Sequence, residues 1–520
     1  MKKSAVVRAL IMPIFCLAIL FGIAVCSLCG ISPQTYLGGV TAEKAEFPEE
    51  SSKALLDGSY QQGLEAYVNE NFPFRSYLVK SYSQFLYSVM GDSSNSNVIM
   101  GEDNYLIEKG YIQSMTADAW EMRYTYKDYV KNLKIIQDTL EAQGKTFFYI
   151  VSPSKAETMV EKIPQYFEVG STDEVVTQHE LLVFFLEEYG IKYYDTIHTV
   201  REVKKEKVYS PYTKNGTHWT YYAAARSVSD IFGSLYVQTG VELLQPQIMV
   251  VDGDLPSGED LDLQRLINAP YTQQDDVYAQ VQVSYNIPED YVAPKAYLFG
   301  TSFQEQIGFV VGQGDVFKDY RSLKYLLTET RFEAPRVDLA LDGTVQEERM
   351  QEILEYYDIF FFETNASGVS ESHIELVSWM ANKLSSGEQI KIKLDVDEAQ
   401  KLEINTTVPE LQTSMGEKFS VAVTLKNDST CTLKSDEKSI YPFCFAYRIY
   451  DMNGKLIKDG EWTALTEDLE AGTENTYDVN ITAPEAAGEY KVQITAVQDK
   501  VIWVEMANPE FPIYLPISVQ

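Results

Sequence analysis

The sequence predicts a doubly wound, mostly parallel α/β domain, followed by a C-terminal β-sandwich and preceded by one transmembrane helix. Three patterns support this prediction: an uncharged apolar run near the N-terminus, helix-like and strand-like segments that alternate through the middle of the chain, and short alternating runs towards its end. A chain of 520 residues, of which 45% are hydrophobic, is long enough for two or three domains with buried cores.

The first pattern is the run from Ala9 to Ile31, which follows Lys2, Lys3 and Arg8. Its 23 residues carry no charge, and a helix of that length can span a hydrocarbon core of roughly 30 Å. The run is longer than the core of a usual signal peptide and has no clear small-x-small cleavage site, so we expect an uncleaved signal anchor. The positive-inside rule then predicts a cytoplasmic N-terminus and a membrane-anchored, extracytoplasmic bulk.

The second pattern starts with a helix-like stretch whose apolar positions run from Tyr126 to Leu140. It ends at Gly144 and leads into FFYIV at 147–151, which reads as a buried strand. A helix followed directly by a strand is the repeating step of a parallel sheet. Further strand-like runs lie at 191–196, 248–252, 295–300 and 357–364, with helix-like segments at 173–189, 220–238 and 345–356.

The third pattern begins after about residue 398, where helix signals give way to FSVAVTLKN, FAYRIYD, TYDVNIT and YKVQITAV, separated by the turn sequences MNGK and PEAAGE. It predicts a β-sandwich of roughly Ig-like size. Cys431 and Cys444 could pair there on facing strands, which their spacing leaves open. The expected order is a cytoplasmic tip and signal anchor at 1–34, a tether at 35–60, the α/β domain at 61–397 and the sandwich at 398–520.

Charge and composition exclude several classes of partner. The chain has 43 basic and 76 acidic residues, a net charge of −33, which argues against nucleic acid or anionic lipid as the main partner. The sequence contains no zinc-ligand spacing. We therefore expect neither a metal nor a cofactor.

The stretch AYLFGTSFQEQIG at 296–308 carries the first candidate for chemistry, Ser302. An apolar strand runs into Gly300-Thr301-Ser302 and then into a segment that can start a helix. A serine at such a turn presents its hydroxyl at the carboxyl edge of the sheet, and the amides that begin the helix can stabilise an oxyanion. The alternative is that Ser302 only caps the helix.

A serine nucleophile needs a base, and His218 is the best of the four histidines. It lies in YTKNGTHWTYYAAARS at 212–227, a loop rich in turn-forming residues ahead of a helix. The others are poorer candidates, because His179 lies in a charged helical stretch, His198 just after a strand and His373 in the polar segment SESHIE. The alternative for His218 and Trp219 is a packed aromatic corner.

Six stretches in order resemble one known family. They are NENFPFRSYLVK (69–80), NVIMGEDNYLIEKGYI (97–112), FFYIVSPSKAETMVEKIP (147–164), THWT (217–220), FGTSF (299–303) and the strand that ends at Glu363. Together they resemble the SGNH-hydrolase-like proteins of the alginate O-acetyltransferase type (AlgX/AlgJ, with an Asp-His-His-Trp motif). The resemblance covers about residues 65 to 370.

This resemblance implies serine-dependent O-acyl transfer or ester hydrolysis on a cell-surface or exported polysaccharide. Ser302 matches the nucleophile and His218 the general base, and backbone amides around residues 302 and 303 would hold the oxyanion. Thr301, Phe303, Lys155 and Trp219 are the other residues expected at the oxyanion and substrate pocket. A membrane-bound O-acyltransferase is the expected acyl donor, because acetyl-CoA is not available outside the cell.

The chain departs from the family pattern beside His218. The family's aspartate stands two residues before the histidine, where this chain has Gly216; three residues before stands Asn215. Asn215 could orient the imidazole in place of the aspartate, or Asp195 or Glu363 could approach from another strand. Without such a group, the chain would be a catalytically degenerate glycan-binding or scaffold protein. Ser154, where the family often has asparagine, is a smaller departure.

The C-terminal region resembles the Ig-like accessory domains of bacterial surface proteins in YRIYDMNGKL and in LEAGTENTYDVNITAPEAAGEYKVQI. Alginate acetyltransferases can carry a carbohydrate-binding sandwich at this place. Trp462 or Trp503 could stack on sugar rings, whereas the alternative places them in the core of the sandwich.

Overall fold

The computed structural model describes residues 25, 29, 35–39, 45–48, 51–167, 175–253, 256, 258–325, 328–331, 337–338, 347–386, 393–435 and 441–520. The predicted transmembrane run from Ala9 to Ile31 lies outside them, except for Val25 and Cys29. Among the described residues, no helix has both the length and the apolar character needed to cross a membrane.

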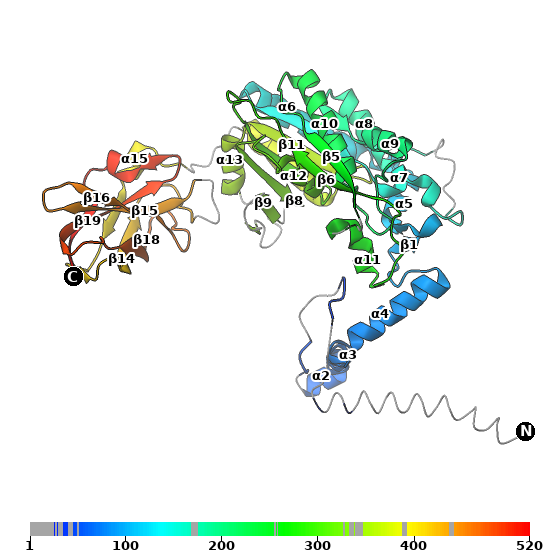
Figure 1. Ribbon diagram of the computed structural model, residues 1–520, viewed down its shortest axis with the longest axis horizontal. Coiled ribbons are helices and arrows are strands. Elements are labelled where there is room, and N and C mark those ends of the chain that lie inside the picture. Colours follow the sequence, from blue (N-terminus) through cyan, green and yellow to red (C-terminus); the bar gives the residue numbers. More distant parts are fainter. Residues whose placement is uncertain are drawn as a thin grey trace, which may run out of the picture.

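A seven-stranded sheet forms the centre of the α/β domain (Figure 1). Its strands are β3 (Thr146–Ser152), β4 (Tyr193–Asp195), β7 (Lys295–Gly300), β8 (Asp319–Lys324), β9 (Thr328–Arg331), β10 (Val337–Asp338) and β11 (Ile359–Asn365). They lie in the order β10-β9-β8-β7-β11-β3-β4. The strands from β8 to β4 are parallel, whereas β9 pairs antiparallel with β8 and β10 with β9. The predicted mostly parallel sheet is confirmed.

Helices cover both faces of this sheet. The longest are α6 (Arg123–Ala142), α8 (Gln178–Glu188), α10 (Tyr221–Thr239) and α14 (Glu371–Ser386), and shorter ones are α5 (Lys109–Thr116), α7 (Lys155–Thr158), α9 (Ile197–Glu206), α12 (Gln304–Val311) and α13 (Glu347–Tyr356). Phe147 and Tyr149 of β3 share a core with α6, α8 and α14. Phe148 and Ile150 share the opposite core with α10 and α12. Because both faces are buried, the central strands are continuously hydrophobic rather than alternating.

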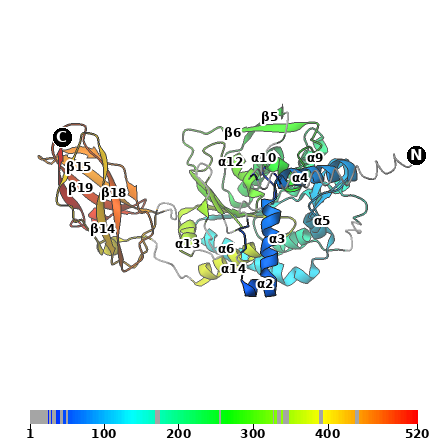
Figure 2. The same ribbon diagram turned by 90° about the horizontal axis from the view of Figure 1, so that it is seen from below.

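The strand predicted at 248–252 exists, but it lies outside the main sheet. It is β5 (Gln247–Gly253), which pairs antiparallel with β6 (Tyr278–Ser284) (Figure 2). Its residues alternate between partly buried and exposed, as in a strand with one solvated face. Between the two strands lie the 3₁₀ turn η6 (Gly258–Leu261) and helix α11 (Asp262–Leu266). We refer to residues 258–277 as the insertion.

Several elements precede the first strand of the main sheet. They are the helices α2 (Ser52–Asp57), α3 (Ser59–Asn71) and α4 (Arg75–Phe85), the π-helical turn η1 (Leu86–Met90), and the hairpin β1 (Val98–Met100) and β2 (Leu106–Glu108). Short 3₁₀ turns are η2 (Glu102–Asn104), η3 (Trp120–Met122) and η4 (Val160–Lys162). The predicted tether at 35–60 therefore already contains α2 and the start of α3. Figure 1 shows α2, α3 and α4 projecting from the α/β domain.

The C-terminal region consists of two sheets around one hydrophobic core. One sheet contains β12 (Leu402–Asn405), β14 (Lys418–Asn427) and β18 (Thr473–Thr482). The other contains β13 (Leu411–Thr413), β15 (Phe443–Asp451), β16 (Leu456–Asp459), β17 (Thr463–Ala464), β19 (Gly488–Gln498), β20 (Ile502–Trp503) and β21 (Ile513–Val519), and the short helices are α15 (Val396–Ala399) and α16 (Val504–Ala507). The predicted β-rich region is confirmed, whereas its Ig-like type and the predicted domain boundaries stay predictions.

The sequence leaves two questions open in this region: whether Cys431 and Cys444 form a disulfide, and whether Trp462 and Trp503 lie at the surface or in the core. Cys431 and Cys444 are both buried in it, and no disulfide joins them. Trp462 is 46% exposed and meets Trp503 edge to face, with 5.6 Å between the ring centroids. Trp462 therefore lies at the surface of the C-terminal region rather than in its core.

Candidate active site

Ser302 lies in the turn between β7 and α12, at the carboxyl edge of the main sheet. The preceding Thr301 amide donates a hydrogen bond of 2.7 Å to Glu363 Oε2, and Glu363 comes from the neighbouring strand β11. A Cβ at Gly300 would lie 2.7 Å from the same oxygen. Glycine at this position therefore lets the buried carboxyl of Glu363 approach and fix the turn that carries Ser302.

His218 connects Ser302 to an acid. Its Nε2 lies 2.9 Å from Ser302 Oγ, and its Nδ1 lies 2.7 Å from Asp262 Oδ2. The other oxygen of Asp262 accepts the backbone N–H groups of Thr217 at 2.8 Å and of Leu263 at 2.6 Å. The Ser302 hydroxyl thus faces the imidazole rather than capping α12. This order of serine, histidine and aspartate is that of a catalytic triad.

The surroundings of His218 favour its protonated form. The side chain is 7% exposed. Burial alone lowers its pKa, but the hydrogen bond and charge of Asp262, together with the charges of Glu259 and Glu305, outweigh burial and raise the pKa above its ordinary value. In the neutral ring the proton stays on Nδ1, bound to Asp262, which leaves Nε2 to accept the proton of the Ser302 hydroxyl.

A family model for the SGNH hydrolase-like domain of the acetyltransferase AlgX matches residues 98–358, half of the chain. The chain belongs to this family. The match contains the motifs THWT and FGTSF, so the predicted family is confirmed.

Solved structures similar to this chain have low sequence identity to it. The O-acetyltransferase domain of Pseudomonas putida AlgJ is 11% identical; the match covers 55% of this chain and 99% of that chain, with a TM-score of 0.38. Pseudomonas aeruginosa AlgX is 12% identical; the match covers 77% of this chain and 94% of that chain, with a TM-score of 0.37. Bacillus cereus PatB1 is 12% identical; the match covers 54% of this chain and 99% of that chain, with a TM-score of 0.36. No curated protein matches the chain.

The structure explains why the aspartate of the AlgX-family motif is missing at Gly216. A Cβ there would lie 2.8 Å from the carbonyl oxygen of Asp260 and 3.0 Å from its Cα. The Thr213 hydroxyl holds the same carbonyl with a hydrogen bond of 2.6 Å. The insertion therefore passes directly over position 216, and two residues further on it brings Asp262 to His218.

The prediction that Asn215 orients His218 is wrong. The Asn215 amide donates to the Gln273 carbonyl at 2.9 Å and to Gln274 Oε1 at 3.2 Å, so it fastens the insertion instead. The two alternative acids are also engaged elsewhere. Asp195 lies 2.8 Å from His179 Nε2, and Glu363 binds Thr301 under the nucleophile turn. The sequence indicated an acid next to His218 or at the end of a strand. The acid is instead Asp262, which belongs to the insertion.

Lys155, predicted at the pocket, is fully buried and holds the loop before His218. Its Nζ donates to the carbonyl oxygens of Leu106 at 2.7 Å, Thr213 at 2.8 Å and Gly216 at 2.7 Å. Burial lowers the pKa of this amine, and the charges of Asp262, Asp275 and Glu108 oppose that shift only in part. The prediction is corrected: Lys155 shapes the backbone from which His218 projects and does not line a substrate pocket.

Trp219 and Phe303 are also buried, so neither has an exposed face for substrate. The Trp219 indole donates to the Phe303 carbonyl at 3.2 Å, and the centroids of the Phe303 and His218 rings are 4.7 Å apart. Trp219 therefore ties the base-bearing loop to the nucleophile turn. The Phe303 amide, predicted as an oxyanion donor, lies 3.2 Å from the Thr301 hydroxyl and donates to it.

Tyr325 is a site residue that sequence reasoning missed. Its hydroxyl lies 3.4 Å from Ser302 Oγ, and its amide donates to the Gly300 carbonyl at 3.1 Å. The residue has a φ of 51°, in the left-handed region that non-glycine residues rarely adopt. It follows β8, which is the neighbour of β7 in the sheet. The adjacency of these two strand ends would locate Tyr325 beside Ser302. It can be recognised only when the order of the strands in the sheet is known.

Among the described residues, one group could hold a metal ion: His218, Glu259 and Asp262 each offer a ligand atom, and these atoms lie within 4.8 Å of one another. The same histidine and aspartate form the hydrogen bond of the triad. A cation at this place would therefore compete with that hydrogen bond.

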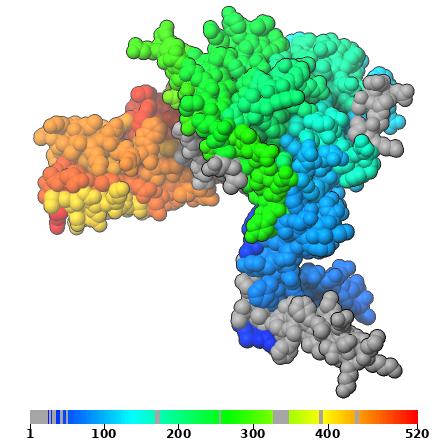
Figure 3. Space-filling model, turned by 45° about the vertical axis from the view of Figure 1, so that its right-hand side comes forward, coloured from blue at the N-terminus to red at the C-terminus, as the bar shows by residue number. Residues whose placement is uncertain are grey.

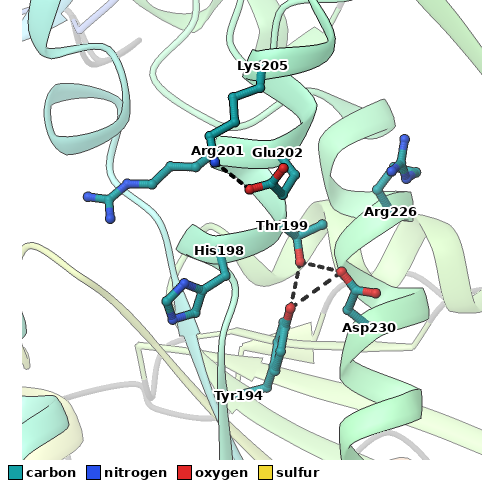
Figure 4. Close-up of a pocket in the computed structure, with 8 residues that line it drawn as sticks. All are labelled: Tyr194, His198, Thr199, Arg201, Glu202, Lys205, Arg226 and Asp230. Carbon is teal, nitrogen blue, oxygen red and sulfur yellow. Dashed lines mark hydrogen bonds and ion pairs between the residues drawn. The ribbon is translucent and has the colours of Figure 1, made fainter.

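A separate cavity of about 430 Å³ lies between α9 and α10 (Figure 4). Its lining includes His198, Arg201, Lys205 and Arg226, and neither Ser302 nor His218 belongs to it. The acids Glu202 and Glu206 bind Lys205 and Arg226, respectively. Because Lys205 and Arg226 are paired with acids, they add little net positive charge to the cavity.

Proposed function

We propose that the chain is an extracytoplasmic, serine-dependent O-acyltransferase or acetylesterase that acts on a cell-surface or exported polysaccharide. The observation that carries this proposal is the continuous hydrogen-bond chain from Ser302 through His218 to Asp262. Membership of the AlgX acetyltransferase family supports the choice of an acetyl group.

In the first half-reaction, Ser302 Oγ attacks the carbonyl carbon of the acyl donor while its proton passes to His218 Nε2. Asp262 keeps Nδ1–H directed towards itself and stabilises the imidazolium that forms. The tetrahedral intermediate collapses when the leaving group takes the proton from Nε2. The product is an acyl ester on Ser302.

In the second half-reaction, a sugar hydroxyl attacks the acyl carbonyl and gives its proton to His218 Nε2. Ser302 leaves as the alkoxide and takes that proton back, so the enzyme is regenerated and the sugar carries the acyl group. Water in place of the sugar hydroxyl gives hydrolysis by the same steps. The Tyr325 hydroxyl, 3.4 Å from Ser302 Oγ, is the side chain placed to donate to the oxyanion.

The proposed location and donor rest on the sequence. The uncharged run from Ala9 to Ile31 supports a membrane anchor with the catalytic domain outside the cytoplasm. Outside the cell no acetyl-CoA is available, which supports a membrane-bound O-acyltransferase as the partner that supplies the acyl group.

The alternative, a degenerate glycan-binding or scaffold protein, was favoured by the missing acid at positions 215 and 216. Asp262 now supplies an acid to His218, which removes that reason. Glycan binding fits the C-terminal region as a second role. A cavity of about 440 Å³ there is lined by Trp462, Lys418 and Asn480, an exposed aromatic ring beside polar groups.

The experiment compares the full chain with Ser302→Ala on a chromogenic acetyl ester, with and without an acceptor oligosaccharide. Ser414→Ala, an exposed serine in the C-terminal region, is the matched control. We expect turnover in the parent and the control, only a small residual turnover in Ser302→Ala, and in the parent an acetyl mass on the peptide that contains Ser302. Equal turnover in all three proteins contradicts the proposal.

A further inference from the structure

Helix α4 and the turn η1, residues Arg75–Met90, have an inverted burial pattern. Their buried side chains are Ser76, Ser83 and Tyr87. Six large apolar or aromatic side chains are instead 47% to 66% exposed, whereas Val79 and Leu86 are partly buried. The exposed ones are Tyr77, Leu78, Tyr82, Phe85, Val89 and Met90. Tyr77, Leu78, Tyr82, Phe85 and Val89 recur at helical spacing and so form one stripe, which we call the outer face. A water-soluble helix normally has the opposite arrangement.

The inner, polar face is fixed to the rest of the protein. Gln84 Nε2 donates to the Tyr271 carbonyl at 2.9 Å, and Gln84 Oε1 accepts the Tyr271 amide at 2.8 Å. The Tyr87 hydroxyl accepts the Gln273 amide at 2.8 Å. These bonds set the rotation of the helix, so the outer face is directed away from the insertion. Figure 3 shows the N-terminal helices at the surface, away from the C-terminal region.

The charge of this segment differs from that of the whole chain. Between Arg75 and Met90 there is no acidic residue, and the only charged side chains are Arg75 and Lys80, in a protein with a net charge of −33. Aromatic and aliphatic side chains on one face together with basic residues are typical of helices that lie in the membrane interface.

Residues 35–38, which bind α4 and the insertion, give the distance to the proposed membrane anchor. The Thr35 amide donates to Ser76 Oγ at 2.7 Å, and the Gly38 amide donates to Asn268 Oδ1 at 2.8 Å. The uncharged run ends at Ile31, four residues before Thr35. Four residues span at most about 14 Å. With the run in the bilayer, the start of α4 therefore stays within about that distance of the point where the chain leaves the membrane.

We propose that the outer face of α4 and η1 lies on the lipid surface of the membrane that holds the N-terminal run. Lipid fits better than a protein partner, because the link from Ile31 leaves little room between this face and the bilayer. The proposal rests on the N-terminal anchor but not on the acyl-transfer chemistry. Because Tyr271 and Gln273 of the insertion are bound to this helical segment, the proposal also places the insertion, and with it Asp262, beside the membrane.

The test measures how deep a single side chain lies in the bilayer. Phe85→Trp and, separately, Tyr82→Trp are made in the full chain and reconstituted into phosphatidylcholine vesicles whose acyl chains carry bromine, a quencher of tryptophan fluorescence. Tyr514→Trp, a 49% exposed position on β21, is the matched control. Far-ultraviolet circular dichroism confirms that each variant is folded.

We expect most of the fluorescence added at positions 82 and 85 to be quenched and blue-shifted, and the fluorescence added at position 514 to be unaffected. Quenching at 82 and 85 no greater than at 514 overturns the proposal. A full chain that does not associate with the vesicles also overturns the proposal. So does a Phe85→Cys variant that cross-links into a dimer, if the tryptophans at positions 82 and 85 are not quenched. A loss of esterase activity alone concerns the proposed function and leaves this result unchanged.

Discussion

The backbone of Asp260 occupies the space that a side chain at Gly216 would need, with 2.8 Å between a Cβ at position 216 and the Asp260 carbonyl oxygen. The family motif has an aspartate at this position, and here the insertion excludes it. The same insertion supplies Asp262 to His218 Nδ1 at 2.7 Å. The missing acid and its replacement are thus two consequences of one chain segment.

Restoring the family motif should therefore lower activity. In Gly216→Asp the new Cβ pushes the Asp260 backbone away and moves Asp262 with it. A displacement of about 1 Å in such a site can lower the rate about 10²-fold, and we expect kcat/KM on an acetyl ester to fall by roughly that factor. Gly233→Ala is the control, because a Cβ there meets no atom within 4 Å. Activity equal to or above the parent in Gly216→Asp would contradict this account.

The pH dependence should report the environment of His218. The general base must be neutral, and Asp262 raises the pKa of His218 above its ordinary value of about 6.5. We therefore expect kcat/KM to rise with pH and to reach half of its plateau above pH 6.5. In Asp262→Asn the residual activity should have its midpoint at lower pH, since the raising charge is gone. An unchanged midpoint in that variant would show that Asp262 does not act on His218.

Tyr325 should contribute to the transition state. Removal of one oxyanion donor from a serine protease lowers kcat by about 10²-fold to 10³-fold. We expect a loss towards the lower end of this range in Tyr325→Phe, with KM little changed, because the ring remains and only the hydroxyl is removed. Tyr166→Phe, at a 74% exposed position, is the control. If Tyr325→Phe keeps the kcat of the parent, the oxyanion is held by backbone amides alone.

A second histidine should affect stability rather than catalysis. His179 Nδ1 lies 2.6 Å from Glu157 Oε1 and its Nε2 lies 2.8 Å from Asp195 Oδ2. Burial opposes its protonation, but the two carboxylates prevail and raise its pKa to about 10. The stabilisation is complete below the ordinary histidine pKa of about 6.5 and is lost as pH rises through about 10.

Urea unfolding of the parent and His179→Gln measures this effect. The difference in the free energy of unfolding between them should shrink between about pH 6.5 and about 10, by at most about 1.4 kcal/mol per pH unit. A difference that stays constant over this range would mean that His179 is not charged in the folded protein.

Local patterns were sufficient to predict half of the site. Ser302 follows a buried strand and precedes a helix, and His218 lies in a turn-rich loop, so both could be located without knowledge of contacts. Asp262 could not, because DGDLPSGEDLDLQ at 252–264 contains several acids that look alike in sequence. Only the tertiary contact with His218 distinguishes Asp262 from Asp260 and Glu259.

The wrongly assigned residues have a common cause. Lys155 and Trp219 are polar or amphipathic residues next to predicted catalytic segments, which is the usual setting of substrate-binding groups. Both are instead buried and hold the two catalytic loops through backbone carbonyls. For β5, the sequence predicted the strand but not its partner, since pairing with β6 depends on contacts that a single run of residues does not encode.

The central claim is that Ser302 reacts through a His218 that is oriented by Asp262. A double-mutant cycle on kcat for a chromogenic acetyl ester tests it most directly, with Ser302→Ala, Asp262→Asn and the double variant. In a serine protease, the corresponding aspartate-to-asparagine change costs about 10⁴-fold, and we expect a loss of that order in Asp262→Asn. Asp290→Asn, an exposed acid after β6, serves as the control and should behave like the parent.

Because the three residues act as one unit, the double variant should be no slower than Ser302→Ala alone. Losses that multiply in the double variant, or an Asp262→Asn variant as fast as the parent, would contradict the claim that the insertion supplies the acid of the triad.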